Sequence, residues 1–349
     1  MAQRLAALIQ CFSHKRRVTE DVFWLKENAE LLNILECTEQ RVAPSALTAF
    51  EPFYAGLEDR FAFFPQYYRF LLSIALDLED LGMPGDKAAG LIDSALRSGL
   101  AETELSDLQR GEANRLFARR GQPARVADPG LNDRLRGFCR RGATFALPNK
   151  KAAYELTHIV FYLSEYGRRD PELDDVACRS LDYAGTLAYL DQNADLLAEI
   201  CIALRYAGRT PPQLWESWIG REAAGFVVTE GGGMQLQDDY HAYFTCNWLQ
   251  ALAGRDCFCF LPDGCRAQFM HGSISVGPLR SLSENLFAMG PRRRDDWHAV
   301  RDQIYAMLDP GGQDILMEAE ANCSDFSAFF EIFARATTSR ARLPWEVVT

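Results

Sequence analysis

The chain has 349 residues, of which 48% are hydrophobic and 11% aromatic, enough apolar mass for one large core or two smaller ones. It carries 48 acidic and 37 basic residues, so its formal net charge is −11. This charge repels phosphate backbones and anionic membranes, and we expect no nucleic-acid partner. No apolar run approaches the roughly 18 residues of a membrane span, so we expect no membrane insertion.

The N-terminus contains a short apolar stretch, but it lacks the basic leader and the small-residue cleavage site of a signal peptide. We therefore expect a cytoplasmic protein. In that compartment thiols stay reduced, and the ten cysteines are interpreted first as small buried hydrophobic residues.

In chain order, several segments predicted to be helices end in the same way, with an apolar run closed by glycine. The closing residues are Gly82, Gly121, Gly167, Gly208, Gly254 and Gly290, and successive ones lie 39, 46, 41, 46 and 36 residues apart. Glycine is favoured there because the residue just after a helix often adopts a left-handed conformation. A period of about forty residues predicts a series of helical hairpins.

Between these segments, residues 170–190 and 210–226 also have helical patterns with prolines near their starts. Strand-like runs are few, and we expect two β-hairpin insertions, at 226–237 and 257–270. The sequence thus predicts an all-α single domain over 1–349, with a weak candidate boundary near 121–140. The hairpins form either an open superhelix or a closed α/α toroid, and their unequal lengths favour the closed form.

Alignment of the four strongest segments on their glycines places polar residues at two positions of otherwise apolar helices. Nine residues before the glycine stand Ser73, His158, Glu199 and Thr245. Thirteen before it stand Arg69, Tyr154, Asp195 and His241. Positions four apart share one face of a helix, so these side chains are expected on one face of each segment.

Two spacings in this set are typical of metal sites in helical bundles. Glu155 lies three residues before His158, and Asp238 lies three before His241, so each pair stacks a carboxylate and an imidazole on a helix. Glu199, with or without Asp195 beside it, would supply a further carboxylate from the helix between, and iron or manganese would be the metal. Candidates for a fourth ligand are Asp77, Asp80 and Glu320.

A structural interpretation of the same residues stays open. Hydrogen bonds from Glu199 to His158 or His241 would account for them without metal or catalysis. Asp238 is also expected at the start of its helix, where aspartate is favoured because it bonds free backbone amides.

The segment "CFCFLPDGC" raises a second metal question, because Cys257, Cys259, Cys265 and His271 lie close in sequence. The Cys-x-Cys spacing differs from that of structural zinc sites, so a β-hairpin acting as a hydrophobic lid is favoured over zinc. Phosphate-binding loops, dinucleotide fingerprints, nucleophile elbows and His-Glu-x-x-His motifs are missing.

Four phrases together resemble an uncharacterised family of α-proteobacterial proteins of similar length. They are "DVFWLKENAELLNILECTEQ", "FFPQYYRFLLSIALDLEDLG", "KKAAYELTHIVFYLSEYG" and "DQNADLLAEICIALRYAG". The resemblance covers most of the chain. It implies a bacterial cytoplasmic protein and transfers no activity and no functional residue.

Two functions are therefore predicted as alternatives. The first is a helical-repeat binding or interaction protein whose aromatic residues line a groove or pocket for a protein or a small-molecule ligand; they are Trp24, Tyr67, Tyr68, Trp215, Trp218 and Trp248. The second is a helical enzyme, metal-dependent or using acid–base catalysis, whose pocket is formed by Glu155, His158, Glu199, Asp238 and His241.

Overall fold

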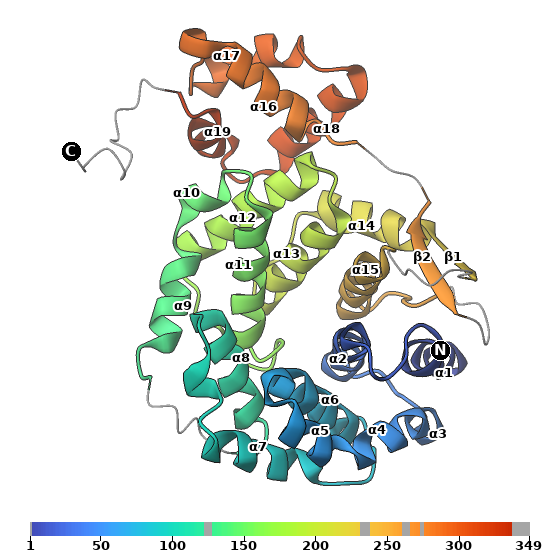
Figure 1. Ribbon diagram of the computed structural model, residues 1–349. Helices are drawn as coiled ribbons and strands as arrows, with labels where there is room; N and C mark the ends of the chain where they lie inside the picture. The colour runs from blue at the N-terminus through green and yellow to red at the C-terminus, as the bar shows by residue number, and fades with distance from the viewer. Residues whose placement is uncertain (1, 122–127, 231–237, 260–265, 273–275, 337–349) are drawn as a thin grey trace.

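The computed structural model describes residues 2–121, 128–230, 238–259, 266–272 and 276–336 (Figure 1). Across these residues the fold is all-α with one small antiparallel sheet, as the sequence predicts. One buried apolar cluster extends from Leu5 to Ala334, so helices from both ends of the chain share a core.

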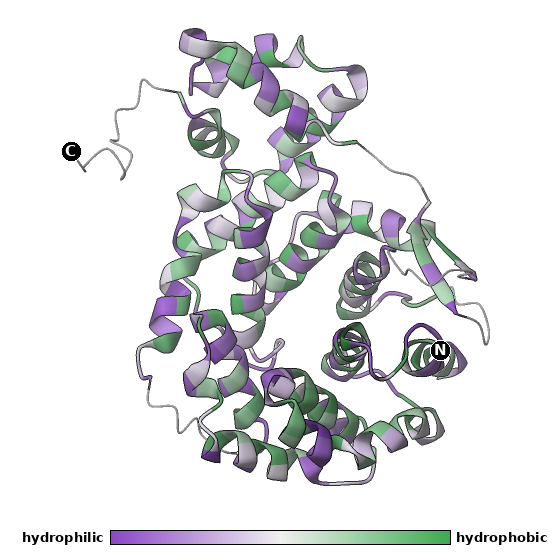
Figure 2. Ribbon diagram, in the orientation of Figure 1, coloured by the Kyte–Doolittle hydropathy of each residue, from purple (hydrophilic) through white to green (hydrophobic). Residues whose placement is uncertain are grey.

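Six helices follow one another around the centre of the molecule, and we call them the ring helices. They are α2 (Val22–Cys37), α6 (Tyr68–Asp80), α8 (Asp107–Ala118), α11 (Lys150–Leu163), α13 (Ala194–Tyr206) and α15 (Tyr240–Leu252). Each packs against the next, and α15 returns to contact α2. Hydrophobic and hydrophilic residues share these helices, as Figure 2 shows for α11 and α13.

Other helices connect successive ring helices along the chain. They are α3 (Pro44–Leu47), α4 (Glu51–Ala55), α5 (Leu57–Phe63), α7 (Lys87–Arg97), α9 (Leu131–Cys139), α10 (Gly142–Phe145), α12 (Asp175–Leu190) and α14 (Gln213–Gly225). The N-terminal α1 (Ala2–Gln10) and a π-helical turn, η1 (Cys11–Lys15), precede the ring. Four 3₁₀ turns complete the helical segments: η2 (Thr48–Phe50), η3 (Pro65–Tyr67), η4 (Ala101–Thr103) and η5 (Gly290–Arg292).

The C-terminal helices form a layer at the top of Figure 1, beyond α12. They are α16 (Leu279–Ala288), α17 (Trp297–Tyr305), α18 (Pro310–Asn322) and α19 (Phe326–Ala334). Helix α18 packs on α12, so this layer lies on the outer side of the ring. No helix in the described ranges is long and apolar enough to cross a membrane.

The six predicted helix-closing glycines all have positive φ, between +52° and +104°, which confirms the reason for the period. Gly167 is constrained twice. Its φ is +87°, and a Cβ there would lie 2.5 Å from the ring of Tyr206 on α13. Glycine at this position therefore sets how closely the end of α11 approaches the next ring helix.

Helix α2 belongs to the same series, although the sequence pattern missed it. After its last helical residue, Cys37, the chain reverses at Glu39, whose φ is +53°. The amide of Gln40 donates to the carbonyl of Leu35, as in a Schellman motif. The residue in the left-handed position is glutamate instead of glycine, so a search for glycine-closed helices cannot detect α2.

The two strands differ from the expected pair of hairpins. Strand β1 (Phe226–Glu230) pairs antiparallel with β2 (Ala267–His271), so one strand from each insertion meets across α15. Residues 231–237 and 260–265, and with them the expected turns, lie outside the described residues. Cys257 and Cys259 precede β2 and belong to no strand.

Arg16 joins the first ring helix to the last, and we call its contacts the seam. Its guanidinium donates to Glu27 of α2 at 3.1 Å, to Asp238 just before α15 at 2.8 Å, and to the carbonyl of Ala267 in β2 at 2.6 Å. Arg16, Glu27 and Asp238 have almost fully buried side chains. A buried cation shared by two carboxylates is costly to separate, so the seam holds the ring closed.

Replacement of Glu39 with glycine should stabilise the protein. Removing the left-handed penalty of a side chain outweighs the added freedom of the unfolded chain, for a gain on the order of 0.5–1 kcal/mol. Urea unfolding measures it. The control is Glu331→Gly at an exposed position inside α19, which should cost about 1 kcal/mol. A loss of stability in both variants would contradict this interpretation of the end of α2.

Candidate functional site

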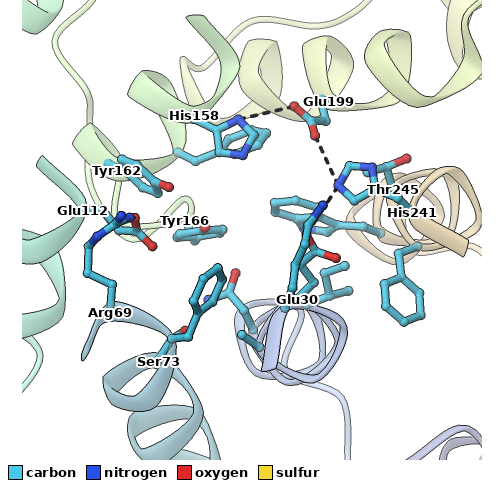
Figure 3. A pocket seen from close by; sticks show the side chains of 18 of the residues that line it. Glu30, Arg69, Ser73, Glu112, His158, Tyr162, Tyr166, Glu199, His241 and Thr245 are labelled. Atoms are coloured by element: carbon cyan, nitrogen blue, oxygen red, sulfur yellow. Dashed lines mark hydrogen bonds and ion pairs between the residues drawn. The ribbon is translucent and has the colours of Figure 1, made fainter. Parts of the chain in front are cut away.

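A pocket of about 260 Å³, open to solvent, lies between the ring helices. All six contribute side chains to it, and Figure 3 shows several of these side chains directed toward a common space. The positions of the lining residues follow from counting back from the left-handed residue that ends each ring helix. The reference residues for this count are Glu39, Gly82, Gly121, Gly167, Gly208 and Gly254, all with positive φ. After α11 the left-handed conformation begins earlier, at Glu165, so Gly167 stands two residues beyond the close of that helix.

The middle layer of the pocket contains the residue nine positions before each end. These residues are Glu30, Ser73, Glu112, His158, Glu199 and Thr245, and every one lines the pocket. The column aligned from sequence therefore belongs to one pocket. It holds three carboxylates, one imidazole and two hydroxyls.

The mouth of the pocket is formed by residues thirteen positions before the end. Lys26, Arg69 and His241 line it, and the Lys26 side chain is 47% exposed. Tyr154 and Asp195 stand at the same level without lining the pocket, and they form a chain behind it. The Tyr154 hydroxyl donates to Asp195 at 2.7 Å, and Asp195 contacts His241 at 2.8 Å.

The floor is formed one turn further on, six positions before the end, by Asn33, Arg115, Phe161 and Trp248. All four are buried. The ring of Tyr166 stacks on Trp248 with centroids 5.7 Å apart. The floor is thus aromatic, with one cation and one amide among its rings.

His241 is the charged centre of the mouth. Its Nδ1 bonds Oδ1 of Asp195, and its Nε2 lies 3.9 Å from both Glu30 Oε1 and Glu199 Oε1. Burial on its own would lower the pKa of His241, but the charge and hydrogen bond of Asp195, with the charges of Glu30 and Glu199, raise it to about 10. The imidazole is therefore a cation at neutral pH.

The two carboxylates beside His241 differ in character. Burial would raise the pKa of Asp195, but the charge of His241 and the hydrogen bonds from His241, Tyr154 and Thr245 lower it, so Asp195 is ionised. Burial raises the pKa of Glu199, and the nearby histidines offset this only in part. Glu199 is 2% exposed and accepts from Thr157 at 2.6 Å.

His158 lies on the other side of Glu199, with Nδ1 3.6 Å from Glu199 Oε2 (Figure 3). The same Nδ1 lies 2.8 Å from the Tyr154 carbonyl oxygen, which can only accept a hydrogen bond. Nδ1 therefore carries a hydrogen, which leaves Nε2 as the nitrogen that faces no acceptor. No described residue bonds that Nε2.

Comparison with known proteins identifies a family for this arrangement but no activity. The family described as "Domain of unknown function (DUF6902)" matches residues 1–336. The chain belongs to this family. No curated protein and no solved structure matches it. The expected resemblance to a family of unknown function is therefore confirmed, and the DUF6902 pocket must be interpreted from its own residues.

Three of the predicted site residues meet in the DUF6902 pocket. His158, Glu199 and His241 come from three consecutive ring helices and lie in one continuous contact chain. Asp195, considered as an alternative carboxylate, supports His241 from behind.

Two predicted site residues lie elsewhere. Asp238 is at the seam, where it accepts from Arg16 and from the Phe269 amide, because it precedes α15 and faces β2. Glu155 is half-buried on α11 and does not line the pocket. The two carboxylates of the expected carboxylate–histidine pairs therefore lie outside the pocket that His158 and His241 line.

The other ligand candidates are also engaged outside the pocket. Asp77 and Asp80 bind Arg119, and Glu320 binds Arg301 in the C-terminal layer. His271 contacts Glu222, and Cys265 lies outside the described residues.

Most of the aromatic residues expected to line a groove belong to the core instead. Trp24, Trp215, Trp218 and Tyr68 are buried, and neither they nor the partly buried Tyr67 line the pocket. Trp248 alone of the six lines it.

Within the described ranges, one group of histidine, cysteine and carboxylate donors lies close enough to hold a metal ion: Asp195, Glu199 and His241, with ligand atoms within 4.8 Å of one another. The Asp195 oxygens already accept bonds from Tyr154, Thr245 and His241. The atoms free to coordinate are therefore His241 Nε2 and the Glu199 carboxylate, with Glu30 next to them.

Sequence alignment missed Lys26, Glu30, Glu112 and Arg115, which all line the pocket. Lys26 and Glu30 were missed because α2 ends at glutamate. Glu112 could have been found from the sequence, because it stands nine residues before Gly121. The alignment included only the four strongest segments, and the segment that ends at Gly121 was not among them.

The raised pKa of His241 makes a pH-dependent contribution to stability. A histidine whose pKa rises on folding stabilises the protein fully below its unfolded value, 6.5, and loses that effect as pH approaches about 10. The free energy of unfolding of the wild type should therefore exceed that of His241→Gln most near pH 6 and converge with it near pH 10. Urea unfolding across this range measures the difference.

Imidazole NMR gives an independent check, because His241 should remain protonated at pH 8. A neutral ring at pH 8, or a stability difference that does not vary between pH 6 and 10, would contradict the assigned ion pair.

Proposed function

We propose that this protein binds a small polar molecule in the pocket between its ring helices. The observation that supports this most is the layer of six residues from six helices, Glu30, Ser73, Glu112, His158, Glu199 and Thr245, around one space. Apolar residues at these positions would give a more stable core, because burying polar and charged groups costs free energy. Ligand binding accounts for their presence.

The pocket favours a small molecule over a peptide. Its volume of about 260 Å³ lies just below the usual range of ligand sites, and its lining combines aromatic rings with a few polar groups. The closed packing order of the ring helices supports an α/α toroid of helical repeats, with the ligand held by the inner helices. Eight of the described cysteines, all except Cys11, are free thiols, which suits a cytoplasmic protein.

Native purification of the full chain, followed by denaturation and mass spectrometry, should release a bound small molecule. His158→Gln removes a polar contact at the middle layer and should weaken binding about tenfold, the usual loss for one hydrogen bond at a buried site. Titration of the stripped protein with the identified molecule measures the change.

The matched control is His298→Gln on α17, an exposed histidine of the C-terminal layer that does not line the pocket. It should bind as the wild type does. The proposal is wrong if no small molecule is recovered, or if the recovered one binds the wild type and His158→Gln equally.

A second candidate function is acid–base catalysis on the bound molecule. The supporting observation is that two histidines flank the buried Glu199, each held through Nδ1 and each with Nε2 available. His241, with a pKa of about 10, would act as the proton donor at neutral pH, and His158 would act as the acceptor through Nε2, because its Nδ1 is held by the Tyr154 carbonyl. Asp195 orients His241 as the carboxylate of a catalytic triad orients its histidine.

A metal-dependent form of the same chemistry would hold a divalent ion, such as iron or manganese, with His241 Nε2, Glu199 and Glu30. Asp195 would orient His241 through its bond to Nδ1. The metal would have to displace the proton from His241. Its affinity would therefore rise with pH up to about 10.

If catalysis occurs, incubation of the recovered molecule with excess protein should convert it. His241→Gln should then slow conversion by about 10²- to 10⁴-fold, the usual contribution of a general acid or base. Metal analysis of the same preparation decides between metal-free and metal-dependent catalysis. One iron or manganese ion per chain in the wild type, absent from Glu199→Gln, would favour the metal-dependent form. Equal conversion by wild type and His241→Gln would exclude both.

A further inference from the structure

Arg115 is a buried cation at the floor of the pocket. It comes from the last turn of α8, is 5% exposed and lines the pocket. Its guanidinium carbon lies 4.5 Å from the centre of the Tyr166 ring, which in turn stacks on Trp248. The guanidinium therefore lies within the aromatic floor and away from bulk water.

Several hydrogen-bond donors at the floor of the pocket have no acceptor among the described residues. Nε and Nη1 of Arg115 are buried and have no hydrogen-bond partner, and the same holds for Nδ2 of Asn33. Asp77 is a carboxylate close enough to feel the charge of Arg115: burial raises the pKa of Asp77, and the Arg115 charge acts in the opposite direction. The Asp77 oxygens, however, already accept hydrogen bonds from Arg119 and Ser73.

A buried guanidinium without hydrogen-bonded partners is unfavourable, and contact with an aromatic face compensates for only part of the cost. The backbone next to it is also strained. Tyr166 has a φ of +55°, which is rare for a bulky side chain and costs free energy of its own. Both features persist at one place, the floor of the pocket, as is typical of a binding site.

We propose that Arg115 and Asn33 form an anion subsite at the pocket floor and that the ligand inserts with a carboxylate or a phosphate group pointing toward them. This inference rests on the proposed function and specifies its ligand class. A guanidinium donates two parallel hydrogen bonds to either anion, and the Asn33 amide adds a third donor.

The remaining charges of the pocket permit an anion to reach the floor. The mouth has three cations, Lys26, Arg69 and His241, which attract it. The carboxylates of the middle layer have partners: Glu112 binds Arg69, and Glu30 accepts from Tyr240 at 3.1 Å. The third, Glu199, accepts from Thr157 at 2.6 Å and lies 3.9 Å from the cation of His241.

Thermal unfolding of the full chain tests the subsite with two probes, inorganic phosphate and benzoate, against chloride at equal ionic strength. At least one probe should raise the Tm of the wild type, and the responding probe identifies the anion. Arg115→Met keeps the length of the side chain and removes its charge, so it should weaken binding of that probe about ten- to hundredfold.

The stability of the ligand-free protein gives a readout that does not need a ligand. Arg115→Met should have a Tm equal to or above that of the wild type, because an uncompensated buried charge is removed. The matched control is Arg119→Met. Arg119 is also nearly buried and lies four residues after Arg115, at the C-terminal end of α8. It binds Asp77 and Asp80 at 2.6 Å each, so its loss should lower the Tm.

Three results would overturn the subsite: no Tm response of the wild type to either probe, an equal response in Arg115→Met, or a Tm loss in Arg115→Met as large as in Arg119→Met. Binding of the molecule recovered from the wild type distinguishes a failure of the anion subsite from a failure of the proposed ligand-binding function. If Arg115→Met retains it while His158→Gln loses it, the pocket is correct and the anion subsite is wrong. If both retain it, the proposed function fails as well.

Discussion

The axial register of the ring helices is the constraint on which the pocket depends. Each ring helix ends at a residue in the left-handed conformation, and this fixes where the helix stops relative to its neighbours. Helical residues recur on one face at fixed spacings, and the residues nine positions before these reference residues all line the pocket. A shift of one residue in a ring helix would turn its lining side chain away.

The charges are arranged by depth. Cations surround the mouth, carboxylates and hydroxyls the middle, and a single guanidinium lies at the floor among aromatic rings. Alternating layers of opposite sign stabilise one another, and so reduce the cost of placing many polar groups inside one fold. The exception is the floor, where Arg115 has aromatic neighbours but no hydrogen-bonded anion.

The sequence predicted the fold class and the helix period because both depend on local chemistry, namely glycine at helix ends and apolar periodicity. It also singled out His158, Glu199 and His241, which all line the pocket, because polar residues at two fixed spacings from the closing glycines stood out on otherwise apolar helices. It failed where contacts are long-range. Asp238 stands one helical turn from His241 in sequence, yet it faces Arg16, more than two hundred residues away.

Spacing alone could not reveal that partner, nor could it show that strands of two separate insertions pair with each other. Helix α2 was missed for a different reason. A glutamate occupies a conformation that glycine usually adopts, and only the backbone reveals it.

The seam has a consequence for how the protein is made. Arg16 and Glu27 emerge from the ribosome early, whereas Asp238 and Ala267 follow after most of the chain has been synthesised. Until then the hairpins already made can stack as an open arc, in which the first helix exposes a surface meant for the last. Closure joins residues that are distant in sequence and is expected to be slow, because loop entropy must be lost before the contacts form. The nascent chain therefore has no complete pocket until α15, which contributes His241, Thr245 and Trp248, has been synthesised.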